Sequence, residues 1–329
     1  MPDSQSVIVL REYRLAMNAA EDEIIREMGE RWLAIERALE SNMAALANEM
    51  LLKAQAGEVV TDAMIRRSER YAILKTQMEA EIAKYNREAA RIVTAGQENA
   101  LRLGIQAATD AITVTYPTAL SASFNKINFA AVEAMIGKAG DGSPLLELLM
   151  KDFGEAANGL VQELVNGVAQ GFGAVKTARG MADGMGMGMD RALLIARTEL
   201  NGAYRAGSTE QYRQSGVVEG WMRLVARDEA CLACLALDGE RFDTADEMDD
   251  HPNGRCTCVP ILTGMDAPEW EKAQDWFAMQ DEARQREIMG NTRYDLYKAG
   301  TPISDFGIKT FDPTWGNSPR ITPISELEN

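Results

Sequence analysis

The sequence predicts a mainly α-helical protein, with a long N-terminal helical hairpin, a helical core and a small zinc-knuckle module that contains short β-strands. Aromatic residues make up only 6% of the chain while methionine occurs 18 times, a balance that favours helices over sheets. Apolar residues recur at helical spacing along the first hundred positions. All four cysteines and the one histidine lie between positions 231 and 258.

Two long helices are expected at the N-terminus. The first covers about residues 18–56, and its apolar residues are three or four apart: Met28, Trp32, Ile35, Leu39, Met43, Leu46 and Met50. Several of them are also eleven apart, a period of ~3.67 residues per turn that favours a straight or slightly right-handed pairing. Gly57 ends this helix, and a second runs from about Thr61 past Ile92. The short connection predicts an antiparallel hairpin whose apolar faces pack in a core.

The middle of the chain is predicted to hold shorter helices. One is expected at 121–136, followed by a glycine- and proline-rich linker that ends at Pro144, and another at 145–168. The glycine–methionine stretch 181–189 lacks the spacing of a phosphate-binding loop, and it predicts a flexible turn because glycine disfavours helix. Asp190 is then expected to cap a helix over 191–215.

The character of the sequence changes after Gly216. Residues 217–225 predict a strand, 228–260 are rich in turn residues, 268–289 predict an amphipathic helix, and the tail from Thr301 is expected to be irregular. The predicted organisation is a helical arm (1–117), a short helix and linker (118–144), a helical core (145–215), a Cys/His zinc-binding module (216–264), and C-terminal helices with an irregular tail (265–329).

Charge and hydropathy limit the function classes. The formal net charge of −16, from 50 acidic and 34 basic side chains, disfavours direct nucleic-acid contact, which depends on neutralising phosphates. No apolar run reaches the ~18–20 residues that span a bilayer, and the N-terminus lacks the pattern of a secretory signal. We therefore expect no membrane contact and a cytosol-like compartment, where clustered cysteines more often bind a metal than form disulfides.

The cysteines and the histidine are the candidate metal ligands. Cys231 and Cys234 form a CxxC pair, and His251, Cys256 and Cys258 follow. Structural zinc requires four tetrahedral N/S ligands, so these five candidates suffice. Because Cys256 and Cys258 would share one face of an extended segment, either could be the fourth ligand, or both could bind in a Cys₄ site with His251 free.

Other interpretations of this cluster are less well supported. A redox CxxC would need βαβ surroundings, and a zinc deaminase would need an HxE motif upstream. A catalytic zinc keeps one position open, whereas five candidates favour a closed site, and unbound reduced cysteines are the main alternative. The single histidine restricts triad chemistry, and acidic runs such as the one from Glu21 to Glu23 are typical of solvated helix faces. We expect no enzymatic activity.

An ordered set of residues resembles a known family. The set comprises Ala196, Arg197, Thr198, Glu199, Ala203, Tyr204, Gly207, Tyr212, Trp221, Asp228, Cys231, Cys234, Asp238, Gly239, His251, Pro252, Asn253, Arg255, Cys256 and Pro260, followed by a run from Trp276 to Gly300. It resembles the phage Mu F-like minor head proteins, the head-morphogenesis family of tailed phages, over about residues 145–300. Members usually read HPxCRC, so Gly254 departs from the pattern and Cys258 is additional.

The resemblance implies a minor capsid protein in few copies, at the portal or inner capsid shell during procapsid assembly and DNA packaging. The implied location is the virion, and the host cytoplasm during assembly. Portal, capsid or scaffold proteins would be its partners, and the N-terminal helices would bind them or self-associate. Arg197 and Glu199 are interpreted as a buried network that orients the knuckle against Trp221, with a catalytic Glu199 as the less favoured reading. The alternative function is a zinc-dependent nucleic-acid-binding module active in packaging.

Overall fold

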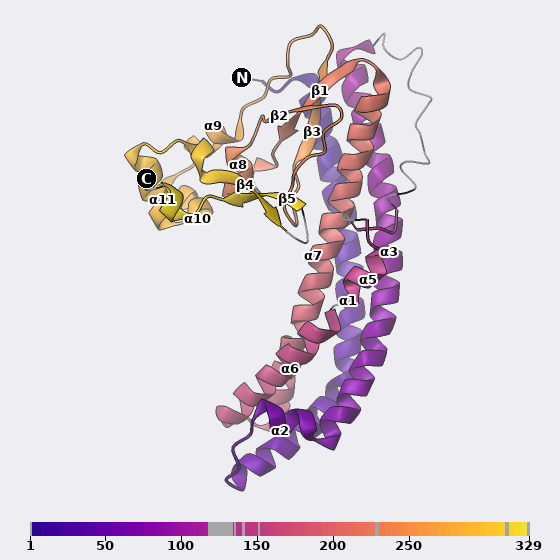
Figure 1. The fold of residues 1–329 in the computed structure, drawn as a ribbon, viewed down its shortest axis with the longest axis vertical. Coiled ribbons are helices and arrows are strands. Elements are labelled where there is room, and N and C mark those ends of the chain that lie inside the picture. Colours follow the sequence, from indigo (N-terminus) through magenta and orange to yellow (C-terminus); the bar gives the residue numbers. More distant parts are fainter. Residues whose placement is uncertain are drawn as a thin grey trace.

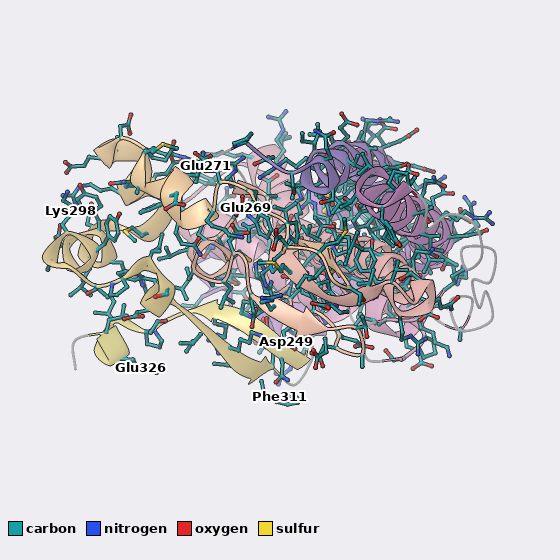
Figure 2. The ribbon with its side chains drawn as sticks, turned by 90° about the horizontal axis from the view of Figure 1, so that it is seen from above. Asp249, Glu269, Glu271, Lys298, Phe311 and Glu326 are labelled. Atoms are coloured by element: carbon teal, nitrogen blue, oxygen red, sulfur yellow. The ribbon has the colours of Figure 1, made fainter. Side chains whose placement is uncertain are left out.

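The computed structural model of the chain describes residues 2–117, 134, 136–139, 142–150, 152–227, 230–312 and 316–327. Long helices form an elongated bundle, and a smaller module of short strands and helices lies beside one end of it (Figure 1). Seen along the bundle, this module extends to one side (Figure 2). The predicted fold class is confirmed. None of the helices in the described ranges is long and apolar enough to cross a membrane.

The predicted N-terminal hairpin is present and is longer than expected. Helix α1 spans Gln5–Gln55, α2 spans Asp62–Arg67 and α3 spans Glu69–Thr115. Helix α1 begins about thirteen residues early because Val7, Leu10 and Met17 extend its buried face. The second helix is split at Ser68, whose hydroxyl accepts a 3.1 Å hydrogen bond from the backbone N–H of Tyr71 and so caps α3.

The prediction of a turn at the glycine–methionine stretch is wrong. After α5 (Leu145–Leu149) and α6 (Asp152–Ala169), one continuous helix, α7, spans Ala174–Ser215 and contains the whole stretch, so Asp190 caps nothing. Met181 and Met185 are fully buried, and a Cβ at Gly184 would lie 2.4 Å from the carbonyl oxygen of Gly159 in α6. The glycine lets the two helices approach closely, and this packing outweighs its low helix propensity. The helix expected at 121–136 lies almost entirely outside the described residues.

Helices α1, α3, α6 and α7 share one hydrophobic core, and α5 packs at its edge. The approach of α3 and α7 is especially close at Gly104 and Gly207. A Cβ at Gly104 would lie 2.0 Å from the carbonyl oxygen of Tyr204, and one at Gly207 would lie 2.3 Å from that of Leu101. The hydroxyl of Ser208 donates a 3.1 Å hydrogen bond to the carbonyl of Gly104 across the same crossing.

The small module begins with the predicted strand. Strands β1 (Val218–Leu224), β2 (Arg241–Asp243) and β3 (Thr257–Leu262) form an antiparallel sheet in the order β2-β1-β3, and helix α8 spans Leu232–Ala236. Trp221 stacks on Phe242 with ring centroids 4.0 Å apart. The hydroxyl of Tyr212, near the end of α7, donates a 2.8 Å hydrogen bond to the carbonyl of Cys258 and so joins the bundle to β3.

The C-terminal region departs from its prediction in two places. The helix expected at 268–289 is two shorter helices, α9 (Ala273–Ala278) and α10 (Glu282–Met289), because the carboxylate of Asp281 caps α10 by accepting from the N–H of Arg284. Helix α11 spans Asn291–Ala299 and a 3₁₀ turn, η3, spans Ile303–Phe306. The tail expected to be irregular forms a hairpin, β4 (Gly307–Asp312) with β5 (Gly316–Ile321), before the short α12 (Ile324–Leu327).

Pairing within the β4–β5 hairpin and its contact with α8 explain why the tail is ordered. A Cβ at Gly307 would lie 2.7 Å from the Cβ of Ala236 and 2.9 Å from the carbonyl oxygen of Ala233. Only glycine allows this approach of the strand to the helix. The division into five segments proposed from the sequence stays a prediction.

Candidate metal centre

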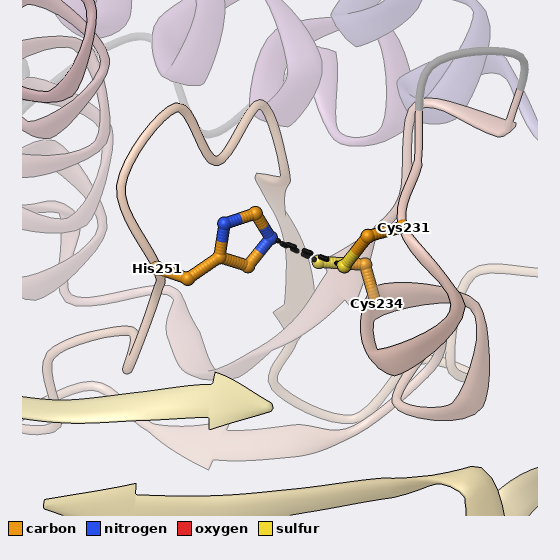
Figure 3. A group of neighbouring side chains, drawn as sticks. All are labelled: Cys231, Cys234 and His251. Atoms are coloured by element: carbon orange, nitrogen blue, oxygen red, sulfur yellow. Dashed lines mark hydrogen bonds between the residues drawn. The ribbon is translucent and has the colours of Figure 1, made fainter. Parts of the chain in front are cut away.

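Three of the five predicted ligands meet in the small module. Cys231 is the residue before α8, Cys234 lies within it, and His251 lies on the loop between β2 and β3. The Nε2 atom of His251 is 3.3 Å from the Sγ of Cys231 and 3.1 Å from the Sγ of Cys234 (Figure 3). For tetrahedral zinc, Zn–S and Zn–N bond lengths imply an S···N separation of about 3.6 Å, so an ion fits after a small expansion.

The histidine ring is oriented as in a metal ligand. Its Nδ1 atom lies 2.7 Å from the carbonyl oxygen of Pro252, which fixes Nδ1–H as the donor and leaves the lone pair of Nε2 directed toward the two sulfurs. A backbone carbonyl at the far nitrogen is the usual partner of a metal-bound imidazole. The backbone N–H of Asn253 donates to the hydroxyl of Thr198 at 3.2 Å, so α7 holds this loop in place.

Cys256 reaches the same centre through Cys234. The ligand atoms of Cys234, Cys256 and Asp250 all lie within 4.8 Å of one another, as do those of Cys231, Cys234 and His251. Cys234 therefore belongs to both groups, and Cys256 is buried immediately before β3. Asp250 forms a 2.7 Å ion pair with Arg205 of α7, which gives its carboxylate a partner of its own.

The structure does not bring Cys258 to this group. Its side chain is fully buried in a separate cluster with Trp221 and Tyr212, whereas Cys256 packs with Cys234. The expectation that the two cysteines share a face assumed one extended segment, but Cys256 precedes the strand. Burial raises the pKa of the Cys258 thiol to about 12, so it remains protonated at neutral pH.

The electrostatics favour thiolates at Cys231 and Cys256, whereas the hydrogen bonds from Cys234 to Cys231 and Cys256 raise the pKa of Cys234 itself. The hydrogen bond from Cys234 lowers the pKa of Cys231 to about 4, against the effect of its burial, and His251 adds to this. Burial acts to lower the pKa of His251, but the thiolate of Cys231 and the carboxylate of Asp250 together raise it to about 9. The hydrogen bond from Cys234 also lowers the pKa of Cys256. The cation beside the Cys231 sulfur is His251, and the cation that acts on Cys256 is Arg223. A divalent ion bound here would take the place of the proton on Nε2 of His251 and use the two thiolates as ligands.

A second polar centre lies between the metal loop and the bundle, around Glu21 of α1. Glu21 is 0% exposed, and its carboxylate is 2.7 Å from Arg255, 3.4 Å from Arg197 and 3.8 Å from Arg14. Asn201 of α7 donates to it at 2.9 Å. Arg197 therefore belongs to a buried network, as the sequence suggested, but its partner here is Glu21.

Sequence reasoning missed Glu21 because it treated the acidic run as a solvated face. The available signal was its spacing: Arg14, Glu21 and Met28 are seven apart and continue the buried stripe of α1. Glu199, the other residue of the network expected from the sequence, lies on α7, where its side chain is buried and has a partner.

Residues 158–260 match the model of the family described as Phage Mu protein F like protein. The match begins in α6, includes α7 and ends in β3, so it covers every candidate metal ligand. The family resemblance predicted from the sequence is confirmed over this segment, which is shorter than the range of 145–300 that was expected. No curated protein and no solved structure matches the chain.

Proposed function

We propose that this protein is a structural component of a tailed-phage head, acting in head assembly at the portal or the inner capsid shell. The observation that carries the proposal is the match of residues 158–260 to the Phage Mu protein F like family, which points to head morphogenesis. The matched segment connects the bundle to the small module, because it contains α7, the metal loop, strands β1 and β2 and the first part of β3. Glu199 is buried and partnered, and the half-buried Arg197 contacts Glu21, which supports a structural role for both.

The proposal predicts that the chain is present in phage particles in few copies. Quantitative mass spectrometry of purified procapsids and mature virions measures this directly, with the major capsid protein as internal standard. Detection of a few copies per particle is the expected result. Absence from both kinds of particle, in a lysate that contains the protein, would refute an assembly role.

The end of the bundle remote from the small module is the surface we propose for portal, capsid or scaffold proteins. The α1–α2 and α6–α7 connections lie there (Figure 1). Exposed apolar side chains occur at or beside them, namely Leu52, Val59, Ile73 and Val175. Scattered exposed apolar residues are common, but four near one end of a bundle suit docking of a helix or a second copy.

Two charged substitutions test this surface. The double variant Leu52→Glu/Val59→Glu should keep the thermal stability of the wild type, because both side chains already face water. It should fail to enter particles in a complementation assay. Leu15→Glu, at an exposed position in the first part of α1, is the matched control. Normal incorporation of the double variant would show that this end is not the docking surface.

For the metal centre we propose a structural zinc ion bound by Cys231, Cys234, His251 and Cys256. The supporting features are the two overlapping ligand groups, the orientation of His251 and the lowered pKa values of two thiols. Thiolates and imidazole in a closed set of four suit zinc. The residues fit such an ion, which would fix the loop carrying His251 to α8.

Metal content of purified variants tests the ligand set. We expect one zinc per wild-type chain by inductively coupled plasma mass spectrometry. Cys231→Ser and Cys256→Ser should lose most of it, while Cys258→Ala should retain it, because Cys258 lies in another cluster. Equal zinc loss in Cys258→Ala would reassign the fourth ligand, and a metal-free wild type would remove the proposal.

A further inference from the structure

Arg223 is a buried cation beside the candidate metal ligands. It lies in β1, where its Cα is paired with that of Cys258 in β3, and its side chain is 0% exposed. An arginine is rarely buried without partners, because removing its charge from water costs free energy that only nearby acceptors offset. The groups around Arg223 therefore indicate what this residue does.

Two of the three guanidinium nitrogens of Arg223 have oxygen partners. Nη2 donates to the carbonyl of Asp249, and Nε is 3.4 Å from a carboxylate oxygen of Glu240. Among the described residues, the buried Nη1 has no oxygen or nitrogen acceptor, and it lies 4.0 Å from the carboxylate of Asp250. One donor nitrogen of this buried cation thus remains available for an acceptor of another kind.

The sulfur of Cys256 is the acceptor next to this guanidinium. The hydrogen bond from Cys234 is the largest effect that lowers the pKa of Cys256, and the charge of Arg223 and a hydrogen bond from its side chain lower it further. Burial acts to lower the pKa of Arg223, but the thiolate of Cys256 and the carboxylate of Asp250 raise it above its usual value. Arg223 therefore stays charged beside a buried thiolate.

Asp250 is a competing candidate ligand. A carboxylate oxygen of Asp250 and the sulfurs of Cys234 and Cys256 all lie within 4.8 Å of one another, so an ion held by Cys234 could take either an oxygen or a second sulfur there. Arg205 pairs with one oxygen of Asp250 at 2.7 Å, and the other oxygen is 4.0 Å from Nη1 of Arg223. The guanidinium of Arg223 thus stabilises the Cys256 thiolate and attracts the carboxylate that competes with it.

We propose that Arg223 is a positioning residue of the metal centre: it donates through Nη1 to the sulfur of Cys256 and so selects Cys256 over Asp250 as the fourth ligand. This inference rests on the proposed zinc site. Zinc with three thiolates and one imidazole carries a net charge of about −1, which a buried guanidinium beside it offsets. Charged donors make strong hydrogen bonds, and such bonds to a ligand orient it toward the metal.

Zinc and cobalt(II) binding to the full chain test this role. Arg223→Met removes the charge and the donor but keeps a long side chain. Its zinc affinity, measured by competition with a chromophoric chelator, should fall by about ten- to a hundredfold. Thiolate-to-cobalt charge-transfer absorption grows with the number of thiolate ligands, so cobalt(II) gives a second readout. This absorption should weaken in Arg223→Met, because Asp250 replaces Cys256 in part of the population.

Three further variants separate positioning from packing. Arg223→Lys restores a positive charge and should bring the zinc affinity back to within about threefold of the wild type. Arg223→Gln is a second neutral variant should Arg223→Met fold poorly, since its amide can still donate to the carbonyl of Asp249. Trp221→Leu is the matched control: Trp221 is fully buried on the same strand and stacks on Phe242, so its loss should lower the Tm and leave the cobalt spectrum unchanged.

The outcomes distinguish the metal site from the role of Arg223. A wild-type chain that binds neither ion would refute the zinc site itself. A wild type that loads, with the same affinity and cobalt spectrum in the neutral variants of Arg223, would refute only the positioning role. An equal loss of charge-transfer absorption in Trp221→Leu would also overturn that role, as would an affinity of Arg223→Lys as low as that of Arg223→Met.

Discussion

Replacing a glycine by alanine near the close crossing of α3 and α7 should either lower or raise the stability of the protein, depending on which glycine is replaced. At Gly104 an added Cβ would lie 2.0 Å from the carbonyl oxygen of Tyr204 and 3.2 Å from the backbone nitrogen of Ser208. At Gly202, two residues before Tyr204 on α7, an added Cβ meets nothing within 4 Å. Gly104→Ala and Gly202→Ala therefore add the same methyl group to the same pair of helices in opposite circumstances.

The magnitude for Gly104→Ala follows from the overlap. A carbon and a carbonyl oxygen approach no closer than about 3 Å, so the helices must separate by about 1 Å, which forfeits up to half of the dispersion attraction at the crossing. Overpacking of this kind costs about 1–3 kcal/mol, and losing the hydrogen bond from Ser208 to the Gly104 carbonyl adds about 1 kcal/mol. Higher helix propensity returns at most about 1 kcal/mol. The net expectation is a loss of about 1–3 kcal/mol.

Thermal unfolding followed by circular dichroism at 222 nm measures both variants. At roughly 2 °C per kcal/mol for a chain of this size, Gly104→Ala should lower the Tm by about 2–6 °C. Gly202→Ala should raise it by about 1–2 °C through its helix propensity alone. A Tm of Gly104→Ala equal to or above that of Gly202→Ala would show that the two helices are not in backbone contact at Gly104.

Three further perturbations follow from the buried polar groups and the metal. Glu21→Gln should cost about 3–5 kcal/mol in urea unfolding because it leaves Arg14 without its carboxylate, while Glu23→Gln, exposed two residues later, should change stability by less than about 0.5 kcal/mol. Asp238→Asn should cost about 2–3 kcal/mol, since its carboxylate accepts from the indole N–H of Trp270 and from two backbone N–H groups; a shift within error would show that these bonds are dispensable. Dialysis against a zinc chelator should lower the Tm reversibly, with recovery on adding zinc, and an unchanged Tm would contradict a structural ion.

The hairpin and the first strand could be predicted because their signals are local. The apolar stripe from Met28 to Met50 specifies a buried helix face whatever lies opposite, and the alternation after Gly216 specifies a strand. The candidate ligands could also be predicted from the sequence, because a CxxC pair and a nearby histidine are defined by their spacing along the chain. Which of Cys256 and Cys258 joins them depends on where β3 begins, a fact set by its pairing with β1.

The errors concern positions whose conformation is decided by distant contacts. From the sequence alone, Gly184 predicts a break in the helix, but in the structure it contacts Gly159 of α6. Gly307 likewise predicts an irregular tail, but in the structure it packs against α8. In both cases glycine serves close approach between elements far apart in the sequence. Helix and strand propensities describe these glycines as flexible. In the structure, the absence of a Cβ allows the neighbouring backbone to approach closely.

The metal loop and the Glu21 network share one residue, Arg255, so one should depend on the other. His251 and Cys256 flank Arg255, whose guanidinium is 2.7 Å from Glu21 in α1. Between them, Asn253 bonds to Thr198 of α7, and Arg205 of α7 contacts both the carbonyl of Gly254 at 3.0 Å and the carboxylate of Asp250. An ion that fixes both ends of this six-residue loop would reduce the conformational entropy that the loop must lose to make those contacts. Through this loop, the zinc we propose would stabilise the seam between α1 and α7 as well as the small module.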